Sequence, residues 1–186
     1  MHLDLVVWRR GLDPAAETCE SALRDLLGVE IAAIERAELW RFEVGEAAGR
    51  ERVALQERLR DAACRAGRYV NLNRDGCEWI DGPCPARSDA APGCWAVDVW
   101  VRDGDGRDPT AVEWFRAQAA PEVYDLRRGT LWRLYLPTAD AAAARELALD
   151  IAVTRARRQG LLANPQAQTA EVLYVVPVAG PRGERS

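Results

Sequence analysis

The sequence has very little histidine and no long apolar run. Its only histidine is His2, close to the N-terminus, so a histidine-based triad or a histidine metal site has nothing to build on. No apolar stretch approaches the roughly 20 residues that a membrane-spanning helix needs. The chain does not open with a basic leader followed by an apolar segment. These absences predict a soluble protein without a signal peptide or a membrane partner.

Motifs that bind phosphates or metals are missing as well. Neither GxxxxGK[ST] nor GxGxxG stands between a predicted strand and a predicted helix. Residues 103–108 alternate aspartate and glycine as a calcium loop does, but Trp114 occupies the loop position where a glutamate ligand is required. We therefore expect the chain to hold no metal and no cofactor of its own, and we assign it no catalytic residue.

Cysteine and charge usage narrow the class of protein further. Five cysteines, an odd number without a CxxC pair, argue against a disulfide framework and favour a reducing compartment, with the cytoplasm as the default. Cys77, Cys84 and Cys94 surround a predicted linker, and we interpret them as reduced thiols whose role the sequence leaves open. A formal net charge of −4 and scattered arginines disfavour nucleic acid as a partner.

What the sequence does contain is an internal repeat. Residues 122–134, EVYDLRRGTLWRL, have a near copy at residues 29–42, VEIAAIERAELWRF. The offset of 92 residues between the two LWR stretches recurs between Trp8 and Trp100. Two fixed points at one offset indicate a tandem duplication.

The repeat sets the predicted domain boundaries. We expect a first repeat at residues 1–80, a linker at 81–93, a second repeat at 94–177 and a disordered tail at 178–186. The linker, DGPCPARSDAAPG, packs three prolines and two glycines into 13 residues and lacks an apolar period. A repeat of this size alone buries only about 60–65% of the surface that its unfolded chain exposes, which favours packing of one repeat on the other.

Apolar periodicity predicts the order β-α-β-β-α-β in each repeat. Hairpins are expected to turn at residues 36–38 and near Arg128-Gly129. Thr138 is the expected cap of the last helix. The predicted fold class is α+β: two antiparallel sheets, each with its helices on one face, form an intrachain pseudo-dimer. The predicted strands are 3–8, 29–35, 39–44, 73–80, 95–101, 123–136 as a hairpin, and 167–176, and the helices follow Asp13 and span 47–66, 109–118 and 139–159.

Three stretches of the second repeat carry a resemblance to a known family. They are residues 122–129 (EVYDLRRG), the helix start Asp108-Pro109, and residues 160–165 (GLLANP) before the last strand. They resemble the PurS family, the small subunit of phosphoribosylformylglycinamidine synthase. The first repeat is less similar: it keeps Asn71 but carries Ala37 where the family has glycine. The chain is thus similar to a tandem fusion of two PurS units.

The resemblance implies an accessory role in purine biosynthesis rather than catalysis. The small subunit of that family bridges the glutaminase subunit and the large synthetase subunit while ammonia passes from glutamine to formylglycinamide ribonucleotide. ATP, magnesium and glutamine would then belong to the whole complex. Because family members form dimers, the fused chain is expected to form a homodimer of four repeats. The alternative is a diverged stand-alone module that binds a small molecule or another enzyme.

Five residues of the second repeat are candidates for contact with a partner, and for each a structural role stays open. Asn164 could instead hold the helix-to-strand junction by bonding its own backbone. Trp132 could be packed in the core rather than present a binding hot spot. A catalytic use of Glu122 or Asp125 is disfavoured, because neither has a visible partner base or metal. The candidates are Asn164, Pro165, Arg128, Gly129 and Trp132.

Overall fold

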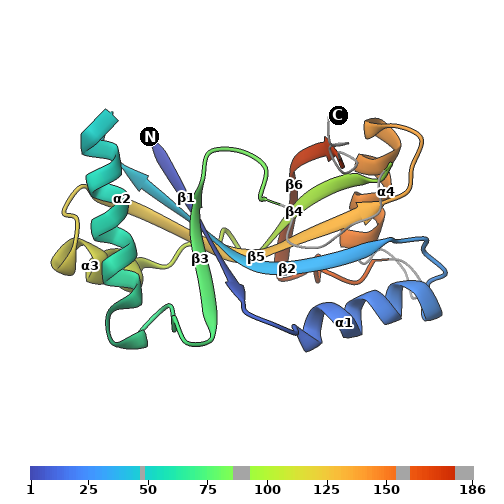
Figure 1. The fold of residues 1–186 in the computed structure, drawn as a ribbon, viewed down its shortest axis with the longest axis horizontal. Helices are drawn as coiled ribbons and strands as arrows, with labels where there is room; N and C mark the ends of the chain where they lie inside the picture. The colour runs from blue at the N-terminus through green and yellow to red at the C-terminus, as the bar shows by residue number, and fades with distance from the viewer. Residues whose placement is uncertain (47–48, 86–92, 154–159, 179–186) are drawn as a thin grey trace, which may run out of the picture. The chain divides into compact units, whose positions relative to one another are not determined.

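The computed structural model of the chain describes residues 1–46, 49–85, 93–153 and 160–178. Within them the fold is α+β, as predicted, with four α-helices and a single six-stranded antiparallel sheet. The elements in chain order (Figure 1) are β1 (His2–Arg9), α1 (Pro14–Ser21), the π-helical turn η1 (Ala22–Leu26), β2 (Ala33–Val44), α2 (Gly49–Cys64), the 3-10 turn η2 (Arg65–Gly67), β3 (Asp75–Ile80), β4 (Trp95–Asp103), α3 (Pro109–Gln118), β5 (Val123–Leu136), α4 (Ala141–Ala152) and β6 (Gln168–Pro177).

The sheet has the strand order β3-β1-β2-β5-β4-β6. In the first repeat β1 pairs antiparallel with both β2 and β3, and in the second repeat β4 pairs antiparallel with both β5 and β6. Backbone hydrogen bonds mark both ends of the β2–β5 pair, from Ala32 N to Tyr135 O (2.8 Å) and from Gly45 N to Glu122 O (3.3 Å). One sheet therefore replaces the two that the sequence predicted.

The two predicted hairpins are wrong, because β2 and β5 are each one continuous strand. β2 runs without a break through Arg36, Ala37 and Glu38, none of which readily takes the positive φ that a two-residue hairpin turn requires. Gly129 lies inside β5, and the pairing of β5 with β4 begins at the adjacent Thr130. Each repeat has the order β-α-β-α-β instead of β-α-β-β-α-β.

Helix starts follow local sequence chemistry. Asp13 and Asp108 each accept a backbone N–H of the first helical turn, at 3.0 Å and 2.9 Å, and a proline fills the first helical position after each of them. These two caps confirm the helix starts that were expected after Asp13 and at Asp108-Pro109. The predicted cap of α4 is wrong: Asp140 caps this helix through its carboxylate (2.8 Å), and the Thr138 hydroxyl donates to the Asp140 carbonyl instead.

The chain divides into two compact units, and each takes segments from both repeats. Unit 1 consists of residues 1–12, 37–81 and 104–129, and unit 2 of residues 13–36, 82–103 and 130–186. β2 passes from unit 2 into unit 1 at Ala37, and β5 leaves unit 1 after Gly129. Residues 86–92 of the predicted linker, the tail 179–186, and residues 47–48 and 154–159 of predicted helices lie outside the described part.

The core of unit 1 joins α2 and α3 to one face of β1 and β2. Trp40 and Phe42 share this face, as their two-residue spacing predicts, and both are fully buried. Phe115 of α3 packs edge-on against both rings, at centroid distances of 6.3 Å and 5.0 Å. Because α2 belongs to the first repeat and α3 to the second, both repeats contribute to this core.

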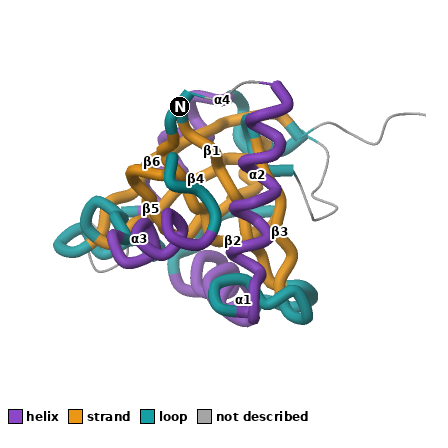
Figure 2. The backbone as a smooth tube through the Cα atoms, turned by 90° about the vertical axis from the view of Figure 1, so that its left-hand side faces the viewer, coloured by secondary structure: helices purple, strands orange, loops and turns teal. Residues whose placement is uncertain are grey.

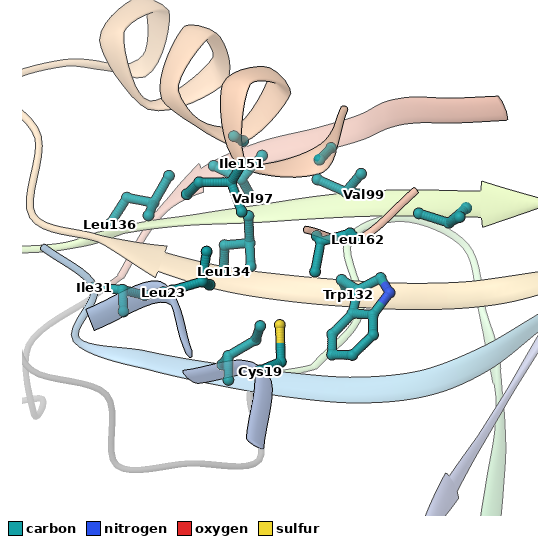
Figure 3. Packing of buried hydrophobic residues seen from close by; sticks show 14 of the residues in the cluster. Cys19, Leu23, Ile31, Val97, Val99, Trp132, Leu134, Leu136, Ile151 and Leu162 are labelled. Carbon is teal, nitrogen blue, oxygen red and sulfur yellow. The ribbon is translucent and has the colours of Figure 1, made fainter. Parts of the chain in front are cut away.

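The core of unit 2 joins α1, η1 and α4 to a face of β4 and β5. Figure 3 shows Val97 and Val99 of β4 and Leu134 of β5 beneath Ile151 of α4. Leu23 of η1 belongs to the same cluster and is fully buried. The helices of this unit come from both repeats too, α1 from the first and α4 from the second.

Candidate functional site

Arg128 of β5 is the centre of a polar and aromatic cluster in unit 1. Its guanidinium donates to Asp108 Oδ2 (3.0 Å) and to Glu38 Oε2 (3.2 Å). The Cζ atom lies 4.4 Å from the ring centroid of Trp40, within the range of a cation–π interaction. Trp40 Nε1 also donates to Glu38 Oε2 (3.0 Å), so Glu38 joins the arginine and the indole.

A ladder of rings extends this cluster toward the surface. Tyr69 packs edge-on against Trp40, with centroids 5.7 Å apart, and against Trp114, at 5.1 Å. The guanidinium of the exposed Arg68 lies over both outer rings, 5.5 Å from Tyr69 and 5.4 Å from Trp114. We call Arg68, Tyr69, Trp114, Trp40 and Arg128 the arginine–aromatic cluster.

The cluster combines two arginines with three aromatic rings. The two arginines have different surroundings: Arg128 is held by two carboxylates, whereas Arg68 is exposed and lies on the partly buried faces of Tyr69 and Trp114. A cation over aromatic faces presents a flat surface that can stack on planar or anionic groups. Sequence reasoning named Arg128 as a candidate and found Trp40 in the repeated LWR stretch, but it missed Glu38, Tyr69 and Trp114.

Unit 2 contains a weaker counterpart of the contacts around Arg128. Arg36, 92 residues before Arg128, lies 3.4 Å from Asp13 Oδ2, and its Cζ is 5.8 Å from the Trp132 ring. Trp132 itself is buried in the core of unit 2 next to Leu134 (Figure 3). The structure gives Trp132 the packing role that the sequence had left open.

Asn164 and Pro165 form an exposed turn before β6 in unit 2. The Asn164 side chain accepts from Gln166 N (3.0 Å), and Asn164 N donates to the Gln168 side chain (2.9 Å). The side-chain oxygen is thus used to hold the turn, while Asn164 and Pro165 remain accessible at the surface.

The turn around Asn71 in unit 1 has the same hydrogen bonds at an offset of 93 residues. Asn71 Oδ1 accepts from Asn73 N (3.1 Å), and Asn71 N donates to the Asp75 carboxylate (3.1 Å). Arg74 donates twice to that carboxylate, at 2.8 Å and 3.0 Å, and thereby holds the pKa of Asp75 below its usual range.

A buried ion pair also recurs in the two repeats. Asp4 on β1 accepts two bonds from Arg41 on β2, at 2.8 Å and 2.7 Å. Asp98 on β4 accepts two bonds from Arg133 on β5, at 2.7 Å and 2.9 Å. Burial raises the pKa of Asp98, and the bonds from Arg133 and from the Cys84 N–H oppose that rise.

The two carboxylates considered for catalysis are engaged in ion pairs. Glu122 accepts from Arg58 (3.0 Å), and a hydrogen bond with its own backbone together with Arg58 lowers the pKa of its carboxyl. Asp125 Oδ2 lies 3.4 Å from the Nε atom of Arg107 and 3.4 Å from that of Arg127. Within the described residues no group of three or more metal-ligating side chains converges. The described helices also include none that is long and apolar enough to cross a membrane.

The five predicted site residues are divided between the two units. Arg128 and Gly129 belong to unit 1, whereas Trp132, Asn164 and Pro165 belong to unit 2. Arg128 lies in the arginine–aromatic cluster, and Asn164 and Pro165 lie in the Asn164 turn; the partner contact expected of the five residues stays a prediction. Comparison with protein-family models and with curated protein sequences gives no match to this chain.

Proposed function

We propose that the chain is a tandem PurS-like protein, an accessory subunit that bridges the glutaminase and synthetase subunits of phosphoribosylformylglycinamidine synthase in purine biosynthesis. On this proposal its two repeats form an intrachain pseudo-dimer. Glutamine, ATP and magnesium are used by the complex rather than bound by this chain. Two chains associate to give four repeats, which light scattering on the purified protein tests directly.

The duplicated hydrogen-bonding geometry is the observation that carries the proposal. The same three kinds of hydrogen bond hold the turns at Asn71 and Asn164. In one of them, Asp75 N donates to the Asn71 carbonyl (2.6 Å) and Gln168 N donates to the Asn164 carbonyl (2.7 Å). Local sequence similarity alone would not require the same contacts. Their recurrence supports descent of both repeats from one ancestor, with the GLLANP stretch retained in the second.

The contacts around the two matched arginines support an ancestral dimer. In unit 1 Arg128 comes from the second repeat and Trp40 from the first, while in unit 2 Arg36 comes from the first repeat and Trp132 from the second. Each arginine is thus placed against the tryptophan of the other repeat. This reciprocity is the arrangement that fusion of two associated, identical subunits would leave in one chain.

The two asparagine turns are the proposed contacts with the partner subunits. Each has an exposed leucine near the asparagine: Leu72 directly follows Asn71 and is 49% exposed, and Leu161 lies three residues before Asn164 and is 43% exposed. A solvent-exposed leucine on a turn that is fixed by hydrogen bonds offers an ordered apolar contact at little entropic cost. We assign one turn to each of the two partners.

Co-purification tests the bridging role. The tagged full chain is mixed with the glutaminase and synthetase subunits from the same source, with glutamine, ADP and magnesium present. We expect both partners to be retained and glutamine-dependent activity to require the chain. Leu161→Glu and Leu72→Glu should each abolish retention of one partner, whereas Leu26→Glu, at another exposed leucine, should retain both.

The outcomes separate the proposal from its alternative. Retention of neither partner, with the chain folded, would contradict the bridging role. That result would favour a diverged module that binds a small molecule or another enzyme. The arginine–aromatic cluster supports this second candidate, because the two repeats do not share it. The second repeat has Leu162 at the position of Tyr69 and Thr130 at the position of Glu38.

A further inference from the structure

Helix α2 lies alongside strand β3 in unit 1 (Figure 2), and contacts along both elements show that they run antiparallel. Near the start of the helix, Arg52 forms an ion pair with Asp81, which directly follows β3. One turn further along the helix, Trp79 Nε1 donates to the Gln56 carbonyl (3.2 Å). The end of α2 is thereby placed next to the first half of β3.

This alignment brings two thiols together. Cys64 is the last residue of α2, and Cys77 lies two residues before Trp79 on β3, so Cys77 and Trp79 point to the same side of the strand. Both side chains pack against the same core of unit 1, and the Cys77 thiol is one of the neighbours that raise the pKa of Cys64. Both thiols are half-buried at the edge of the unit 1 core, and neither is in a disulfide.

We propose that Cys64 and Cys77 are a redox-modification site, at which an intramolecular disulfide fastens the end of α2 to β3. The co-reactant is a small-molecule disulfide such as oxidised glutathione. One cysteine thiolate attacks a glutathione sulfur, the S–S bond breaks, and one glutathione leaves as thiol. The second cysteine then attacks the protein sulfur of the mixed disulfide and releases the second glutathione. Two protein thiols are oxidised, and one glutathione disulfide is reduced to two thiols that take up the two protons.

The environment of the pair determines how the bond behaves. Burial, and to a smaller extent the neighbouring Cys77, raises the pKa of Cys64 to about 11. In either order of reaction Cys64 must attack one disulfide, either glutathione disulfide or the mixed disulfide on Cys77. Only the thiolate form of Cys64 is nucleophilic. Closure at neutral pH is therefore slow. Because the fold does not stabilise a thiolate here, it does not favour the reduced form, and the disulfide resists reduction once it has formed.

The other three cysteines serve as internal controls. Cys19, Cys84 and Cys94 are all buried, and burial also raises the pKa of Cys19 to about 11. We expect all three to stay reduced under conditions that close the Cys64–Cys77 pair. The site does not depend on the proposed bridging function, since its chemistry needs no partner subunit.

Glutathione equilibration followed by peptide mapping tests the site. The full chain is incubated in glutathione buffers, alkylated under denaturing conditions and digested with trypsin. Peptide 61–65 should be recovered cross-linked to peptide 75–87, with Cys84 of the latter alkylated. Closure should be about tenfold faster at pH 9 than at pH 8, as the thiolate fraction of Cys64 requires.

Two single variants keep the test decisive. Cys64→Ser and Cys77→Ser should each remove the cross-linked peptide and leave the remaining cysteine as a thiol or a glutathione adduct. The proposal is overturned if the wild-type chain accumulates only glutathione adducts at these positions. It is equally overturned if Cys84 replaces either cysteine in the cross-link, or if both thiols stay reduced in fully oxidised glutathione at pH 9.

Discussion

At the residue scale, the recurring aspartate–arginine pairs differ in how deeply they are buried. The Arg133 side chain is 4% exposed, whereas that of Arg41 is 18% exposed. A guanidinium that loses its carboxylate keeps more hydration when part of it reaches solvent. The cost of breaking each pair should therefore follow the burial of the arginine.

We expect Asp98→Asn to destabilise the protein by about 3–5 kcal/mol, because it leaves the Arg133 charge buried and uncompensated. The matched variant Asp4→Asn should cost about 1–3 kcal/mol, since Arg41 retains partial hydration. Urea unfolding at neutral pH, with extrapolation to water, measures both losses. An equal or larger loss for Asp4→Asn would show that burial does not decide the cost.

Asp75 provides a residue-scale prediction about pH. Its folded-state pKa is lowered, chiefly by the hydrogen bonds from Arg74, with a further contribution from Asn71 N. A lowered carboxyl pKa adds stability above the unfolded-state value of about 3.9, and this stability is lost as the pH falls through the folded-state pKa. Acidification should thus weaken the wild-type protein through this residue.

The variant Asp75→Gln reproduces the neutral acceptor that Gln168 supplies in the second repeat. It should be less stable than the wild type by about 1 kcal/mol at neutral pH, because the charge-assisted bonds of Asp75 are lost. The difference should shrink as the pH is lowered from about 5 to about 2. A difference that stays constant over this range, in unfolding experiments at each pH, would argue against a role for the charge of Asp75.

At the scale of elements, the continuity of β2 and β5 decides the architecture. β2 lies between β1 and β5 in the sheet, so its backbone is used on both sides. Ala37 is buried at the middle of this strand, where the sequence had predicted a turn. A proline is tolerated in many turns but removes a ladder hydrogen bond from a central strand.

We expect Ala37→Pro to destabilise the protein by on the order of 3 kcal/mol or to prevent folding. The control Ala37→Gly should cost only about 0.5–1 kcal/mol, the entropic penalty of glycine in a strand. Thermal and urea unfolding followed by circular dichroism distinguish the two variants. A proline variant as stable as the glycine variant would favour the hairpin turn over the continuous strand.

At the scale of the whole molecule, neither repeat contains a complete core. Unit 1 needs α3 and the start of β5 from the second repeat, and unit 2 needs α1 and the start of β2 from the first. The apolar faces of each repeat are covered by segments of both, so a single repeat would expose them to water.

Expression of the two repeats as separate chains, residues 1–85 and 86–186, tests this dependence. Each fragment alone should be unfolded or self-associated, because it lacks helices that complete its cores. Mixing the fragments in equal amounts should restore cooperative unfolding and a one-to-one complex by light scattering. Cooperative unfolding of either fragment as a monomer would contradict this expectation.

The sequence by itself determined the features that depend on neighbouring residues. Asp13 and Asp108 before proline set the helix starts, and the alternating Trp40 and Phe42 fixed the buried face of β2, because capping and strand alternation act over a few residues. The sequence also placed Asn71 and Asn164 at matching positions of the two repeats, and the structure shows the same turn at both. For α4 we expected Thr138 as the cap, and Asp140, two residues further on, caps the helix instead.

Only the tertiary structure decided which segments come together. A continuous strand and a hairpin have the same alternation, so the choice at Ala37 and Gly129 depended on distant pairing partners that the sequence does not reveal. The same holds for Arg128, which meets Glu38 from a strand 90 residues away, and for Cys64 beside Cys77. Contacts between segments distant in the chain are set by the packing of the whole core, and local chemistry does not encode them.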